Sequence, residues 1–108
     1  MNFDISKVFA DMLSAVTGTV GENCEEIKTV TKQFLQQNKE RLELIAELRI
    51  TGELPQDKFE SRLNDQKLIL EAQFQAITVI SKAIAQKAAN AAIDVFTKAV
   101  KAAVSAIL

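Results

Sequence analysis

Residues 52–59, GELPQDKF, lie in the middle of the chain and contain the signals that decide its fold. Gly52 can adopt the left-handed conformation that commonly follows the last turn of a helix. A helix that starts just after Pro55 places Leu54 and Phe59 at the two positions of a hydrophobic staple. The turn formed by Gly52, Leu54 and Pro55 therefore predicts two antiparallel helices of about equal length.

The two arms carry the apolar spacing of amphipathic helices. In the first arm, Ile27, Val30 and Phe34 begin a stripe that continues to Leu48. The second arm contains neither Gly nor Pro from residue 56 onward, so it predicts one helix of about 50 residues, roughly 75 Å long. We therefore expect an all-α fold, an elongated antiparallel hairpin of helices at about 22–51 and 56–107, packed as a bundle or coiled coil.

A shorter helix is expected near the N-terminus, at about residues 4–17. Gly18 and Gly21 end it, because glycine is a poor helix former. Its apolar stripe consists of Ile5, Val8, Phe9, Met12, Leu13 and Val16. The 108 residues have the size of one domain, so we expect a single helical domain over 1–108.

One face of the second arm is predicted to form a seam against the first arm. On a helical wheel with 100° per residue, the seam residues share one side, and several are seven residues apart as in a coiled coil. The main seam residues are Phe59, Leu63, Leu70, Phe74, Ile77 and Ile84.

A second apolar face begins after residue 85, almost opposite the seam. It consists of Ile93, Phe96, Val100, Val104 and Ile107. Apolar side chains here span roughly 220° of the helix, whereas packing against one neighbour needs about 100°. Three partners can cover this face: the N-terminal helix, another copy of the chain, or a membrane surface, which the excess of Lys in residues 82–108 favours. We expect contacts between copies to centre on these five side chains.

The composition excludes several chemical classes. The absence of His excludes His-based catalytic triads and His-ligated metal sites, and one Cys cannot form a disulfide within the chain. Glu22, Glu25 and Glu26 fit the first turn of a helix better than a metal site, and Cys24 is expected to be an ordinary thiol.

A formal net charge of −1 argues against nucleic-acid binding. We expect no catalytic residue, metal, cofactor, signal peptide or membrane-spanning helix. A single thiol is typical of a reducing compartment, so we expect a cytoplasmic protein.

Residues 42–70, LELIAELRITGELPQDKFESRLNDQKLIL, resemble the helical hairpin of the bacterial short C-terminal oligomerisation domain family. The matching positions are Leu44, Leu48, Gly52, Leu54, Phe59, Glu60, Leu63 and Leu70. The segment departs from the family in two ways: Pro55 stands where a Ser or Thr cap is common, and the segment is central rather than C-terminal. The resemblance implies self-association and a bacterial source, and it implies no catalysis.

These observations predict a non-enzymatic structural or interaction protein, a self-associating helical assembly or adaptor module. The alternative is a small helical protein that binds or perturbs a membrane surface, such as a toxin or its accessory factor.

Overall fold

The computed structural model describes residues 3–20, 25–77 and 80–107, without the side chain of Ile107. Within these segments the chain forms five helices and no strand. They are α1 (Ile5–Val20), α2 (Glu25–Gln37), α3 (Lys39–Ile50), α4 (Gln56–Gln75) and α5 (Lys82–Ile107). The predicted all-α class is therefore confirmed.

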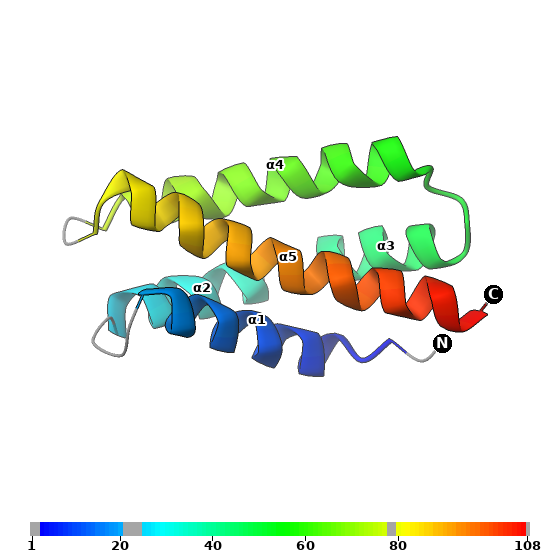
Figure 1. The fold of residues 1–108 in the computed structure, drawn as a ribbon, viewed down its shortest axis with the longest axis horizontal. Helices are drawn as coiled ribbons and strands as arrows, with labels where there is room; N and C mark the ends of the chain where they lie inside the picture. The colour runs from blue at the N-terminus through cyan, green and yellow to red at the C-terminus, as the bar shows by residue number, and fades with distance from the viewer. Residues whose placement is uncertain (1–2, 21–24, 78–79, 108) are drawn as a thin grey trace.

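The helices run up and down as four antiparallel legs, because α2 and α3 follow one another along a single leg (Figure 1). The start of α1 and the end of α5 lie at the same end of the bundle (Figure 1). The last helix, α5, packs against α1, α4 and α3, so it is the common partner of helices from both halves of the chain. This arrangement is that of a small four-helix bundle.

The elongated hairpin with one helix over 56–107 is wrong. Helix α4 ends at Gln75, α5 begins at Lys82, and α5 folds back along α4 (Figure 1). The molecule is compact, with principal extents of 43 × 23 × 20 Å. Two local features explain the break: residues 77–80 are four consecutive β-branched residues, which are poor helix formers, and Ser81 caps α5 by accepting a hydrogen bond on Oγ from the backbone N–H of Ile84 at 3.2 Å.

The predicted helix over 22–51 is bent at Asn38, and its first residues, 22–24, lie outside the described residues. Asn38 has φ −110° and ψ 10°, and its Nδ2 donates to the carbonyl oxygen of Phe34 at 2.9 Å. A side-chain amide that bonds to its own backbone in this way competes with regular helix geometry. The N-terminal helix also differs from the predicted range of 4–17, because it continues through Gly18 to Val20.

The start of this helix is fixed by Asp4. Its carboxylate Oδ1 accepts hydrogen bonds from the backbone N–H groups of Ser6 and Lys7, at 3.1 and 3.3 Å. These bonds satisfy two donors that a helix otherwise leaves without a partner at its first turn.

A turn lies at residues 51–55, between α3 and α4. Gly52 has φ +84° and donates its backbone N–H to the carbonyl oxygen of Arg49 at 3.2 Å. Pro55 is the N-cap of α4, and both staple residues, Leu54 and Phe59, are buried. The Arg49 side chain also connects α3 to the turn and to α4. Its guanidinium donates a hydrogen bond to the Leu54 carbonyl oxygen at 3.2 Å and lies 5.9 Å from the centre of the Phe59 ring.

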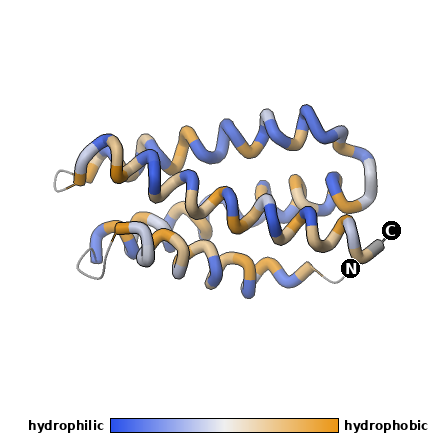
Figure 2. Tube along the Cα trace, viewed as in Figure 1, coloured by the Kyte–Doolittle hydropathy of each residue, from blue (hydrophilic) through white to orange (hydrophobic). Residues whose placement is uncertain are grey.

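The core lies along the bundle axis and receives large side chains from every helix. The largest fully buried ones are Phe34, Phe74, Phe96, Met12, Ile27, Leu42 and Leu70. Hydrophobic residues recur along α1 and α5, whereas α4 carries long hydrophilic stretches on its outer turns (Figure 2). Among the described residues, no helix has both the length and the apolar content that a membrane crossing requires.

Candidate functional site

The five residues predicted to join copies of the chain do not form a free surface. Ile93, Phe96 and Val100 are buried within the single chain, and Val104 is partly buried. The side chain of Ile107 lies outside the described residues. Since no second molecule is needed to bury the first three side chains, the prediction that contacts between copies centre on this face is not supported by the fold of the chain.

The N-terminal segment covers this face of α5. Helix α1 packs along α5 in the opposite direction (Figure 1). Ahead of α1, the Phe3 ring meets the Phe96 ring edge to face, with 6.2 Å between their centroids and 85° between their planes. Of the three partners considered from the sequence, the N-terminal helix is therefore the one that the structure places on α5.

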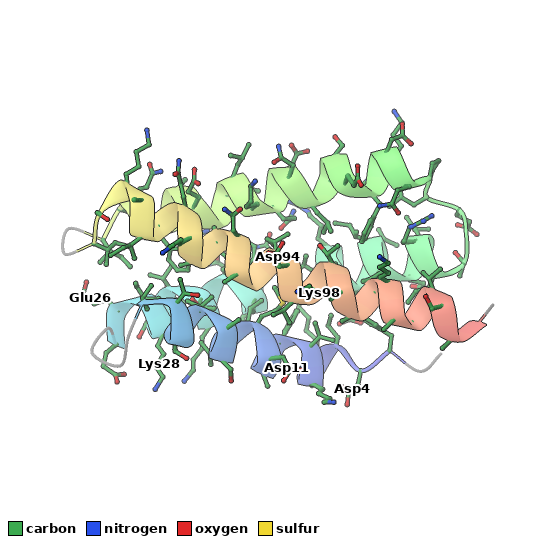
Figure 3. All side chains as sticks on the ribbon, in the orientation of Figure 1. Asp4, Asp11, Glu26, Lys28, Asp94 and Lys98 are labelled. Carbon is green, nitrogen blue, oxygen red and sulfur yellow. The ribbon has the colours of Figure 1, made fainter. Side chains whose placement is uncertain are left out.

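Small side chains line part of the buried side of α5. Ala85, Ala88, Ala89 and Ala92 are fully buried in the first half of α5, and an alanine lets a neighbouring helix approach more closely than a larger residue does. The polar residues of α5 remain on its outer side, where Asp94 and Lys98 are exposed one turn apart (Figure 3). As folded, α5 therefore presents its charged side outward and buries Ile93, Phe96 and Val100.

The predicted seam residues have two outcomes. Five of them, Phe59, Leu63, Leu70, Phe74 and Ile77, are buried. Ile84 is 38% exposed, because the break between α4 and α5 ends the angular register on which the wheel depended. Past the break, the buried side of α5 is centred on different residues, among them Ala88, Ala92 and Phe96.

Few of the described polar side chains have surroundings typical of a catalytic or metal-binding site. Glu25 and Glu26 lie in the first turn of α2, where the helix dipole favours acidic residues, while Glu22 and Cys24 lie outside the described residues. Within the described segments, no three acidic or thiol side chains come together as metal ligands would. Gln66 is the one polar side chain in the described core whose buried oxygen, Oε1, has no hydrogen-bond partner there.

An open groove lies between α1 and α2, with a cavity volume of about 460 Å³. We call it the α1–α2 groove. Its floor is apolar and its edge carries lysines: the floor includes Phe9, Ala10, Leu13 and Leu35, and the edge includes Lys32 and Lys39. Phe9 and Leu13 are only partly buried, because α1 turns its core stripe toward α5 and these two side chains toward α2.

The sequence contained a signal for this groove that the periodicity analysis did not use. Phe9 and Leu13 widen the apolar arc of α1 beyond what one neighbour covers. A second cavity, of about 530 Å³, lies between the start of α1 and the end of α5, and four alanines of α5 form one wall. The α1–α2 groove differs from this cavity in its charge, because it is lined by two lysines and, among the described residues, by no acidic residue, whereas Asp4 and Asp11 line the second cavity.

No family model matches this chain, and neither the curated proteins nor the solved structures contain a significant match to it. The resemblance of residues 42–70 to the oligomerisation family therefore stays a prediction, and the function has to be inferred from the surfaces of the bundle.

Proposed function

We propose that this chain is a non-enzymatic interaction module that assembles with copies of itself. The observation that carries the proposal is the α1–α2 groove, in which the single chain leaves the apolar side chains of Phe9, Leu13 and Leu35 beside polar and basic residues in an open depression. Exposed apolar surface of this kind is stabilised when a partner removes it from water, at about 25 cal/mol per Å².

Large aliphatic side chains are also exposed outside the groove, and one of them, Leu44 on α3, supports the same proposal. Leu44 and Leu68 are each 50% exposed, and Ile69 and Ile84 are each exposed by more than a third. Single exposed leucines are common on soluble proteins, so these residues acquire meaning only when they lie where a partner can contact them. The predicted self-association therefore stays a proposal, with its contacts placed on the α1–α2 groove and the adjoining surface of α3 rather than on the buried face of α5.

The membrane alternative gains no support from the fold as described. Its apolar face on α5 lies under α1, so contact between α5 and lipid would require α1 to leave the bundle. The membrane-binding function therefore belongs to an opened form of the chain, whereas self-association needs no rearrangement.

Sedimentation equilibrium over a range of protein concentrations tests the proposed function. We expect the mass to rise with concentration above the chain mass of 11.9 kDa, as reversible association of copies requires. A mass that stays at the chain mass at every concentration would overturn the proposal.

A further inference from the structure

The charge on the α1–α2 groove restricts what can occupy it. Lys32 and Lys39 line the groove, and no acidic residue is among the described residues that line it. An apolar floor with a basic edge fits a helix that presents an apolar side chain flanked by carboxylates. The charge of the groove therefore favours an occupant that is both acidic and amphipathic.

Helix α3 of this same chain presents such a surface. Leu44 is exposed, with Glu40 four residues before it and Glu47 three residues after it on one helical face, and the exposed Glu43 lies beside these two glutamates, three residues after Glu40 and four before Glu47. We call these four residues the α3 stripe. Leu44 is 50% exposed, and the exposed Arg41, three residues before it, borders the stripe on the other side. The sequence pattern alone therefore indicates only a solvated charged face.

The groove and the stripe adjoin each other. Lys39, at one end of the groove, is the first residue of α3, and its Nζ lies 3.9 Å from Oε1 of Glu43 in the stripe. When two complementary surfaces lie side by side on one molecule, two copies related by a two-fold axis near the border can form both contacts at once. Each copy then places its stripe on the groove of the other.

A contact of this kind has a size requirement. A stable interface buries about 800 Å² on each partner, which is about an eighth of the 6546 Å² surface of this chain. The α1–α2 groove and the adjoining outer side of α3 extend along most of one leg of the bundle.

We propose that the α1–α2 groove of one copy receives the α3 stripe of a second copy, in a symmetric dimer. The proposal rests on the proposed self-association and specifies its surfaces. In the dimer, Leu44 lies on the apolar floor of the partner groove, and the stripe glutamates face the groove lysines.

Reversal of the charges on each half of the contact tests the pairing. One variant carries Lys32→Glu and Lys39→Glu, and the other carries Glu43→Lys and Glu47→Lys. Each variant alone should dimerise at least about tenfold more weakly than the wild type, because like charges then face each other at both contacts.

An equimolar mixture of the two variants should restore dimerisation. In the mixed dimer, the reversed groove meets the reversed stripe and the native groove meets the native stripe, so both contacts again join opposite charges. Lys28→Glu combined with Lys58→Glu is the matched control, since both lysines are exposed and neither lines the groove. The control should dimerise as the wild type does, and Figure 3 shows Lys28 pointing away from the body of the bundle.

A second pair of variants keeps the test decisive if a charge reversal disturbs folding, as judged by circular dichroism. Leu44→Ser should weaken dimerisation, whereas Leu68→Ser, at a leucine equally exposed on α4, should not. A wild-type chain that stays monomeric would overturn both the proposed function and this inference. A wild-type dimer that neither the charge reversals nor Leu44→Ser weakens would overturn this inference alone.

Discussion

Phe96 shows how a residue with an apparent need for a partner is buried by its own chain. It belongs to a face that the helical wheel placed away from the hairpin seam, yet it is fully buried and touches the Phe3 ring edge to face. The helical wheel indicated correctly that this apolar face of α5 has to be buried. It could not identify the segment that packs on this face, because the periodicity of one helix contains no information on which other segment lies against it.

Replacement of Phe96 by Ala should lower the free energy of unfolding by about 3–5 kcal/mol, since a fully buried ring leaves a cavity. Urea denaturation measures the change. Leu68→Ala is the control, because a half-exposed leucine should cost about 0.5 kcal/mol or less. Equal effects of the two substitutions would show that Phe96 is not in the core.

The two described glycines should respond to alanine in opposite directions. Gly52→Ala should destabilise the chain by about 1 kcal/mol, because an L-residue is strained at φ +84° even though no atom lies within 4 Å of the added Cβ. Gly18→Ala, inside α1 with equally open surroundings, should stabilise it by about 0.5–1 kcal/mol. Thermal unfolding of both variants measures the difference, and a stabilising Gly52→Ala would contradict the turn as described.

Gln66 is a polar residue at a core position of α4, and its buried Oε1 has no partner among the described residues. Substitution by Met, which has a similar shape, should raise the free energy of unfolding by about 1 kcal/mol because the desolvation cost disappears. A loss of stability of that size would instead show that the amide makes a hydrogen bond, for example to a buried water.

At the scale of the elements, α1 protects the apolar face of α5. Met12 is fully buried on the inner side of α1, whereas its neighbour Asp11 is exposed. Met12→Lys should cost about 3 kcal/mol or more, since it places an unpaired charge in the core, and it should release α1 from α5. Increased fluorescence of the dye ANS would report the exposed face.

Asp11→Lys is the matched control, because it adds a lysine one residue away on the solvent side. It should leave both stability and dye binding near the wild-type values. If the Met12→Lys chain remains as stable as this control, α1 does not seal α5. Flotation of the Met12→Lys chain with anionic vesicles also tests the membrane-binding alternative. Membrane binding requires that the lysines and the apolar face of α5 contact the vesicle together.

The helices themselves were predicted with unequal success. The turn was predictable because Gly52, Leu54 and Pro55 act locally, through backbone conformation and adjacent contacts. The break before α5 was missed because only Gly and Pro were considered helix breakers, although residues 77–80 are all β-branched and Ser81 is a good cap. Asn38 gave a similar but weaker signal for the bend between α2 and α3.

At the scale of the whole molecule, the break before α5 changes both the shape and the free surfaces. An unbroken second arm would be an extended helix with a long open face. Because α5 instead returns between α1 and α4, the face is buried and the molecule is 43 Å long. The candidate site could not be predicted from the sequence, since the α1–α2 groove depends on how two separate helices share their apolar residues.

The central claim is that the apolar face of α5 is covered by α1 of the same chain, and isotope-filtered NMR on a mixture of labelled and unlabelled chains tests it directly. We predict that nuclear Overhauser effects between the Phe3 and Phe96 rings, whose centroids are 6.2 Å apart, arise only within a chain. Effects between these two rings that connect labelled to unlabelled chains would contradict the claim, because α1 would then cover the α5 of another copy.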